Sequence, residues 1–236
     1  MPRAILFDMG GTLDGGVHWL NRFAALYAEA GLDLSRARVR AAFDEAERRS
    51  AVDDGMLTCG LDAMVDRHVT WQLEHLGGDR SVRSAIVERF VSAVRRAAAE
   101  NVPVLAALSA RGLKLGVVSN GCGNVEALCA DLGFAPYLSV IVDSRRVGVY
   151  KPDPAIFIYA AATMGRPSRS ILMVGDSFDR DIRPAHSIGM MTAWLAGYDT
   201  SGECPDPSLV DIRLRRLSDL PAILESAAAA AGAARS

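Results

Sequence analysis

Carboxylates, a hydroxyl and an ammonium group recur in four short segments, each placed after an apolar run. The segments are Asp8-Met9-Gly10-Gly11-Thr12, Ser119-Asn120-Gly121, Lys151-Pro152-Asp153 and Gly175-Asp176-Ser177-Phe178-Asp179-Arg180-Asp181. If they converge, the carboxylates of Asp8, Asp176 and Asp181 repel one another unless a cation joins them. Hard oxygen ligands with room for water suit Mg²⁺. The residue types therefore predict a magnesium site.

The same residues predict hydrolysis of a phosphate ester. A carboxylate nucleophile such as Asp8 splits the reaction into two easier steps through an acyl phosphate. The hydroxyl of Ser119 and the ammonium of Lys151 would hold phosphoryl oxygens and stabilise the developing charge. The turn Ser119-Asn120-Gly121 can present backbone N–H groups to an anion. We expect Asp8, Ser119 and Lys151 to be catalytic, and residues 119–121 with Lys151 to contact substrate.

The elements that must position these residues are short buried strands alternating with helices. Apolar runs at 4–7, 113–118, 138–142, 171–174 and 190–195 predict parallel strands, and helices are expected near 101–110, 122–132, 153–164 and 178–188. This alternation predicts an α/β fold with a doubly wound parallel sheet. Ligands of such sheets bind at the carboxyl ends of the strands, where all four segments fall.

A long gap interrupts the alternation between the first two strands. Residues 15–98 are rich in Ala, Arg, Glu and Leu at helical spacing and contain no convincing strand. We expect an inserted helical domain over 15–98, beside an α/β core made of 1–14 and 99–225. The Ala- and Gly-rich tail, 226–236, is expected to be disordered or a frayed helix end.

The four segments, in this order, resemble the four motifs of haloacid dehalogenase superfamily hydrolases. The resemblance covers 1–14 and about 100–200, and in position and size 15–98 resembles the helical cap of the family's first (C1) type. It implies a phosphatase-like hydrolase in which Asp8 is the nucleophile and Ser119 and Lys151 contact phosphate. It also implies that Asp8, the Gly10 carbonyl and Asp176 bind Mg²⁺, with Asp181 in or next to the coordination sphere.

One position departs from that pattern. Phosphatases of the superfamily usually carry a second aspartate two residues after the nucleophile, which protonates the leaving group, and this chain has Gly10 there. Three explanations stay open: the substrate has a good leaving group, a neighbour such as Asp14 or His18 substitutes, or turnover is lost. The last case would leave a catalytically weak or silent phosphometabolite-binding protein.

Other chemistry on the same fold is less well matched. A dehalogenase that attacks carbon also lacks the second aspartate, but it needs no metal, so Asp176 and Asp181 would be idle. Cleavage of a phosphonate through a Schiff base needs a lysine in the cap, and 15–98 contains none.

The bulk composition narrows partners and location. A formal net charge of −2 provides no basic surface for nucleic acid. No apolar run approaches the roughly 20 residues that span a bilayer, and the start lacks the pattern of a signal peptide. We expect a cytoplasmic protein, a monomer or homodimer, acting on a small phosphorylated substrate. His68, Trp71, Gln72 and His75 share one helical face by their spacing, whose role the sequence does not define.

Overall fold

Six parallel strands form one sheet in the order β3-β2-β1-β4-β5-β6. The computed structural model describes residues 1–196 and 204–233. The strands are β1 (Ala4–Phe7), β2 (Lys114–Ser119), β3 (Leu138–Asp143), β4 (Ile171–Gly175), β5 (Met191–Leu195) and β6 (Ile212–Leu214). This confirms the predicted doubly wound α/β fold. Strand β6 was not predicted, because three residues are too few to show a period.

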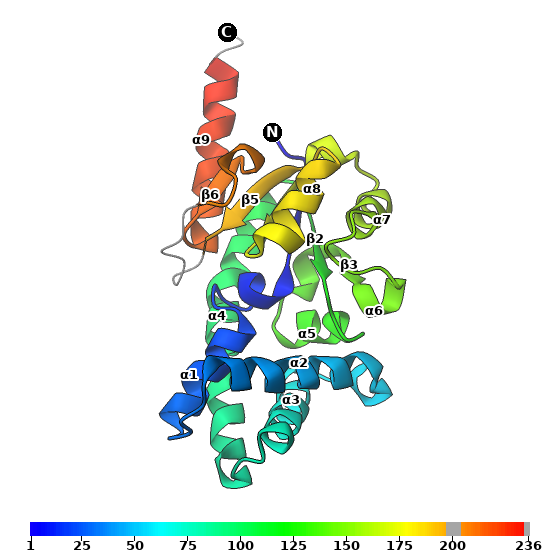
Figure 1. Ribbon diagram of the computed structural model, residues 1–236. Coiled ribbons are helices and arrows are strands. Elements are labelled where there is room, and N and C mark those ends of the chain that lie inside the picture. The colour runs from blue at the N-terminus through cyan, green and yellow to red at the C-terminus, as the bar shows by residue number, and fades with distance from the viewer. Residues whose placement is uncertain (197–203, 234–236) are drawn as a thin grey trace.

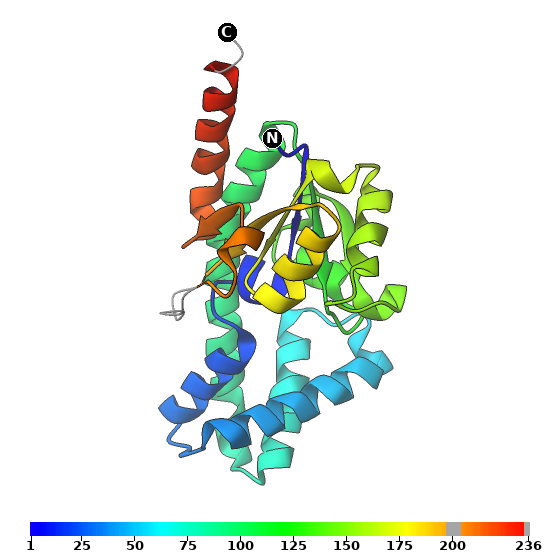
Figure 2. The ribbon, with the colours of Figure 1, turned by 45° about the horizontal axis from the view of Figure 1, so that its top comes forward.

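Helices cover both faces of the sheet (Figures 1 and 2). They are α4 (Arg83–Ala110), α5 (Val125–Asp131) and α9 (Leu220–Ala233) on one face, and α7 (Ala155–Met164) and α8 (Arg183–Ser187) on the other, with the short α6 (Ser144–Val147) after β3. The alternation along β1 shows why. Ile5 and Phe7 join the apolar cluster that contains α4, α5 and α9, whereas Ala4 and Leu6 join the cluster of α7 and α8. Strands buried on both faces read as continuous apolar runs.

Helices also make up the segment between β1 and β2. Helices α1 (Trp19–Glu29), α2 (Arg36–Val52) and α3 (Leu61–Leu76) pack with the first half of α4, beyond the carboxyl edge of the sheet (Figure 1). The stacked rings of Phe23 and Phe90, with centroids 4.4 Å apart, lie in the core of this group. Within residues 15–98 the structure contains no strand, as the sequence predicted.

Helix α4 joins the two parts of the chain without a break. It runs for 28 residues and includes Pro103. The expected domain boundary near 98–99 therefore falls inside one continuous helix. The side-chain amide of Asn101 donates to the Leu13 carbonyl over 2.9 Å, which ties α4 to the loop after β1. The division into core and cap stays a prediction.

The expected tail overlaps the last helix. Helix α9 spans Leu220–Ala233, and Leu220 and Leu224 on its first turns are buried against the core. Most of the segment 226–236 is thus helical, and 234–236 lie outside the described residues. In the described ranges, none of the helices combines the length and the apolar character that crossing a bilayer requires.

Candidate active site

The four segments meet at the carboxyl edge of the sheet. The register pairs Phe7 with Val117 on one side and with Val174 on the other, so the residues that follow β1, β2 and β4 leave the sheet together. The backbone N–H of Asp8 donates to the Val174 carbonyl over 2.9 Å and fixes the start of the first loop. The polar residues at the ends of three strands that are distant in sequence therefore lie together at the carboxyl edge of the sheet.

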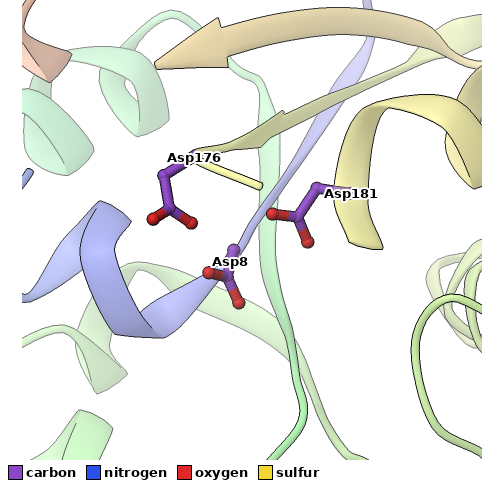
Figure 3. Close-up of side chains that lie close together, drawn as sticks. All are labelled: Asp8, Asp176 and Asp181. Carbon is purple, nitrogen blue, oxygen red and sulfur yellow. The ribbon is translucent and has the colours of Figure 1, made fainter. Parts of the chain in front are cut away.

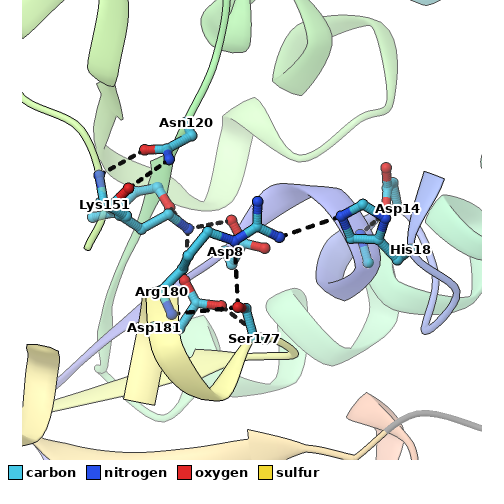
Figure 4. Close-up of polar contacts among 10 residues, drawn as sticks. Asp8, Asp14, His18, Asn120, Lys151, Ser177, Arg180 and Asp181 are labelled. Carbon is cyan, nitrogen blue, oxygen red and sulfur yellow. Dashed lines mark hydrogen bonds and ion pairs between the residues drawn. The ribbon is translucent and has the colours of Figure 1, made fainter. Parts of the chain in front are cut away.

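Lys151 is the centre of a buried ion-pair network. Its ammonium donates to Asp8 Oδ1 (2.6 Å), Asp181 Oδ1 (2.7 Å) and the Val118 carbonyl (3.1 Å), which uses all three of its protons (Figure 4). Burial lowers the pKa of Lys151, but the carboxylates of Asp181 and Asp8 outweigh burial and raise it above its ordinary value. The side chain is therefore a fixed positive charge beside Asp8.

Asp8, Asp176 and Asp181 face a common space (Figure 3). One oxygen from each lies within 4.8 Å of the others. Burial raises the pKa of Asp176 to about 8, with the charges of Asp8 and Asp181 adding to the effect. Burial also raises the pKa of Asp181 to about 6, although Lys151 opposes it. Three carboxylates this close are unfavourable together without a cation.

These residues fit a magnesium ion. Asp176 Oδ1 is buried and has no hydrogen-bond partner among the described residues, which is what a carboxylate oxygen reserved for a ligand would show. Glycines make room for the acidic side chains. A Cβ at Gly11, where φ is +86°, would collide with the Asp176 carboxylate, and a Cβ at Gly175 would collide with Asp181.

The end of β2 and the turn after it place Ser119 in the pocket and hold the backbone of Lys151. Ser119 is buried and lines the pocket beside Asp8. The side chain of Asn120 is occupied by the backbone of Lys151: its amide nitrogen donates to the Lys151 carbonyl (2.9 Å), and its oxygen accepts from the Lys151 N–H (2.8 Å). Asn120 thereby positions Lys151. Gly121 is required by packing, because a Cβ there would overlap Val125 and Asp143.

Gly10 leaves open space where the superfamily's phosphatases usually carry an acid. Its φ of −77° and ψ of 116° suit any L-residue, and a Cβ at this position would have no atom within 4 Å. Gly10 lines the pocket next to Asp8. The absence of an acidic side chain here therefore has no steric cause in the surrounding structure.

Two of the nearest titratable groups are Asp14 and His18. Asp14 is buried and accepts hydrogen bonds from the Gly11 N–H (2.6 Å) and from the indole of Trp19. Burial raises its pKa to about 6, a value suited to proton exchange near neutrality. His18 lies 3.2 Å from Arg180, and burial together with that guanidinium lowers its pKa (Figure 4). His18 is thus held in the neutral form.

A pocket of about 310 Å³ opens from Asp8 towards the helical segment. Residues not assigned to the site from sequence line it: Trp19, Phe43, Glu47, Ser50, Met64, Val94, Leu128, Tyr150 and Arg180. Phe43, Glu47 and Ser50 follow helical spacing on α2. That spacing places the three residues on one face of α2, but it does not show whether this face packs against a core or contacts a ligand.

The face of α3 expected to act as a unit is divided in the structure. His68 and Gln72 are buried inside the helical segment, whereas His75 is exposed and Trp71 is half-buried. None of the four lines the pocket. The i, i+3, i+4 and i+7 spacing places them on one broad helical face, and packing against α1 and α2 buries only His68 and Gln72.

Comparison with known proteins identifies the family and agrees with the fold. A family model for haloacid dehalogenase-like hydrolases matches residues 2–189, and the chain belongs to that family. A glyceraldehyde 3-phosphate phosphatase of Methanopyrus kandleri is 30% identical over 81% of the chain and 83% of its own length. An N-acetylmuramic acid 6-phosphate phosphatase of Pseudomonas putida is 30% identical over 95% of the chain and 97% of its own.

The fold is shared with enzymes of other chemistry. An L-2-haloacid dehalogenase of Xanthobacter autotrophicus with chloropropionic acid covalently bound superposes with a TM-score of 0.59 at 19% identity, covering 95% of this chain and 99% of that one. At this identity the similarity concerns the fold alone. Together with the phosphatase relatives, membership of the family makes the chain an enzyme of the hydrolase class that is similar in sequence to phosphatases.

Proposed function

We propose that this protein is a Mg²⁺-dependent phosphatase that acts on a small phosphorylated metabolite through an aspartyl-phosphate intermediate on Asp8. The observation that carries the proposal is the arrangement of Asp8 between a fixed ammonium, Lys151, and two further carboxylates, Asp176 and Asp181. The phosphatase names of the relatives support phosphate esters as the substrate class.

The metal ligands we propose are Asp8, the Gly10 carbonyl and Asp176, with Asp181 in or next to the coordination sphere. When bound, magnesium would offset the negative charge that the phosphate brings to a pocket already containing three carboxylates. Asp176 Oδ1, which lacks a partner in the described part of the chain, is available for this role.

In the first step Asp8 attacks phosphorus. Its Oδ1 accepts from Lys151 over 2.6 Å, so Oδ2 is the oxygen that forms the new P–O bond while the ester P–O bond breaks. In the second step water attacks the phosphorus, the acyl phosphate bond breaks, and Asp8 and inorganic phosphate are released. Ser119 and the ammonium of Lys151 hold phosphoryl oxygens in both steps, and Lys151 gives up one of its three hydrogen bonds to do so. Asn120 keeps Lys151 in place.

The leaving group must obtain a proton in the first step, and Gly10 cannot supply it. We propose that Asp14 or solvent does so inefficiently, because both Asp14 oxygens already accept hydrogen bonds. Esters with good leaving groups should therefore react fastest. The same observation favours, as a second candidate, a protein that binds phosphometabolites and turns them over weakly or not at all.

Helices α1 to α3 would act as a cap that excludes water from the acyl phosphate and selects the substrate. The pocket supports this, since residues of α2 and of the sheet edge line it together. A dehalogenase remains the less favoured alternative, because carbon chemistry would leave Asp176 without a purpose. A cytoplasmic location and a monomeric or homodimeric state stay predictions.

Phosphate release from p-nitrophenyl phosphate and from a panel of metabolite phosphates tests the proposal. The assay compares added Mg²⁺ with chelator, and wild type with Asp8→Asn. Asp179→Asn is the matched control, since Asp179 lies near the site in sequence but its side chain is 82% exposed. Release that needs both Mg²⁺ and Asp8, and is kept in the control, supports the phosphatase. Binding of Mg²⁺ and phosphate esters without release supports the second candidate.

A further inference from the structure

A continuous hydrogen-bonded chain crosses the interior of the helical segment. The Tyr27 hydroxyl donates to Gln72 Oε1 (3.0 Å), the Gln72 amide nitrogen lies 2.7 Å from His68 Nδ1, and His68 Nε2 lies 3.0 Å from Glu47 Oε1. Tyr27, Gln72 and His68 are fully buried. None of them has a part in the chemistry at Asp8, so a buried polar chain of this length calls for a separate reason.

The hydrogen bonds all run in one direction, from Tyr27 through Gln72 and His68 to Glu47. Because Gln72 accepts through its oxygen, its nitrogen donates to His68 Nδ1, which leaves the imidazole proton on Nε2. Nε2–H then donates to Glu47. The His68 ring is fixed between α1 and α2, parallel to Phe23 at 5.3 Å and edge-on to Trp19 at 6.2 Å. The whole arrangement holds one carboxylate, that of Glu47, in a set orientation.

That carboxylate lies in the pocket. Glu47 lines it, and its side chain is 49% exposed although its partner His68 is not exposed at all. Oε1 is occupied by His68, and in the described ranges no donor contacts Oε2. Burial lowers the pKa of His18 and raises that of Cys122, and the charge of Glu47 opposes the first shift and adds to the second, so Glu47 lies near both groups.

A second polar group accompanies it. Ser50, one turn further along α2, lines the same pocket and is 3% exposed, and its Oγ has no hydrogen-bond partner among the described residues. A buried hydroxyl without a partner is unfavourable unless a ligand or water completes it. Glu47 and Ser50 thus offer a fixed acceptor and an unused hydroxyl on one wall.

The charges in the pocket determine what these groups can bind. The cations that line it are Lys151, which is paired with Asp8, and Arg180, which contacts Ser177 and His18 (Figure 4). No lysine or arginine of the lining accompanies Glu47 on α2. A second anionic group on the substrate would therefore meet a like charge at short range, which disfavours its binding.

We propose that Glu47 and Ser50 form the recognition site for the organic part of the substrate, which carries a hydrogen-bond donor, a hydroxyl or an ammonium, and no carboxylate. This rests on the proposed phosphatase function and specifies its substrate class. Glu47 accepts the donor, Ser50 completes the contact, and the chain from Tyr27 through Gln72 and His68 positions Glu47. Phe43 and Val94 supply apolar contact along the rest of the pocket.

A matched series of alkyl phosphates tests the proposal. The compounds have two to four carbons and end in a hydroxyl, an amino, a carboxyl or a methyl group. Wild type should favour the hydroxyl or amino compound over the carboxyl compound of the same length by at least about tenfold in kcat/KM. Glu47→Gln should reduce that ratio to within about threefold of unity, mainly through KM, and Ser50→Ala should weaken the hydroxyl compound alone. Asp44→Asn, which removes a charge from an exposed position of α2, should change nothing.

The positioning role of His68 has its own readout. His68→Phe keeps a ring against Phe23 but removes the donor to Glu47. It should raise KM for the hydroxyl and amino compounds while kcat for p-nitrophenyl phosphate is retained. A fall in kcat for all substrates would instead indicate general damage to the fold and would overturn a specific role for His68.

The test of Glu47 and Ser50 can fail without the phosphatase proposal failing. The phosphatase proposal is decided by whether turnover of p-nitrophenyl phosphate needs Asp8. If wild type hydrolyses nothing, dissociation constants of the same alkyl series, measured by calorimetry with Mg²⁺, replace kcat/KM, and the expected ratios are unchanged. A wild-type preference for the carboxyl compound, or a preference that survives Glu47→Gln, would overturn the assignment.

Discussion

At the scale of single residues, the site depends on which glycines can change and which cannot. Gly10 and Gly11 are neighbours, yet Gly10 borders open space with ordinary dihedral angles, whereas Gly11 has a φ of +86° and lies against Asp176. An acid at Gly10 would line the pocket that Asp8 also lines, and a methyl group at Gly11 would displace the carboxylate of Asp176, the proposed metal ligand. Substitutions at these two adjacent positions are therefore expected to have opposite effects on activity.

Gly10→Asp should raise the rate of phosphate release from alkyl phosphates by roughly 10²–10⁴-fold, the usual contribution of a positioned general acid. The rate for p-nitrophenyl phosphate should rise far less, because its leaving group needs little protonation. Steady-state kinetics with both substrate types measure the difference. Gly11→Ala is the contrasting variant and should lose Mg²⁺-dependent activity. An equal gain on both substrates from Gly10→Asp would contradict a role in proton transfer.

Asp14 should make the stability of the protein depend on pH. Burial raises its folded pKa from 3.8 to about 6, so between these values the folded state binds more protons than the unfolded state. Its contribution is fully present below pH 4 and is lost as pH rises through about 6. Relative to Asp14→Asn, the free energy of unfolding of wild type should fall by about 2–3 kcal/mol between pH 4 and pH 7. Urea titrations of both proteins at pH 4, 5.5 and 7 measure this, and a constant difference would show that Asp14 does not titrate in this range.

At the scale of elements, helix α6 links the sheet edge to the end of α2. The Arg145 guanidinium donates to the carbonyls of Asp53 (2.9 Å) and Cys122 (3.0 Å) and to the Asp54 carboxylate (2.8 Å). Arg146 adds bonds to the carbonyls of Gly123 and Leu57. Two adjacent arginines thus bind the loop after α2 to the loop after β2.

Arg145→Met should loosen that connection. We expect KM for alkyl phosphates to rise about three- to tenfold, because α2 carries Glu47 and Ser50, while kcat changes less. Faster amide hydrogen exchange over residues 53–57 should accompany the change. Arg216→Met, the same substitution at an exposed residue away from the pocket, is the control. Unchanged exchange in the Arg145 variant would show that other contacts hold the loop.

At the scale of the whole molecule, the stability of the fold is coupled to the charges it brings together. The sheet places Asp8, Asp176 and Asp181 within a few ångströms of one another, against one ammonium. A ligand that binds the folded state alone stabilises it by mass action. The assembled site, which does not exist in the unfolded chain, is therefore the place where magnesium should act on stability.

Saturating Mg²⁺, at about 100 times its dissociation constant, should stabilise the protein by about 2.7 kcal/mol and raise Tm by roughly 5–10 °C. Thermal unfolding with Mg²⁺ and with chelator measures the shift. Asp176→Asn should abolish most of it, and Asp179→Asn should leave it intact. A shift that persists in Asp176→Asn would place the ion elsewhere.

Much of the site was predictable because a parallel sheet imposes its own geometry. Once the runs before Asp8, Ser119 and Asp176 are interpreted as strands of one sheet, their ends must meet at one edge. The α/β fold followed from the same alternation. Neither prediction needs side-chain detail, since each depends on the order of local patterns along the chain.

The pocket wall opposite Asp8 was decided by tertiary structure alone. Helical spacing predicts the same burial for His68 and Trp71, yet packing buries His68 and leaves Trp71 half-exposed. In the sequence, Glu47 and Asp44 are both acidic residues of one predicted helix and cannot be told apart. In the structure, the orientation of α2 places Glu47 in the pocket and against His68, whereas Asp44 pairs with Arg40 at the surface. The orientation of a helix depends on contacts between segments distant in sequence, so its inward residues are defined only after the chain has packed. The sequence by itself determined which polar residues meet at the sheet edge, and the packing of α1, α2 and α3 decided which residues face them.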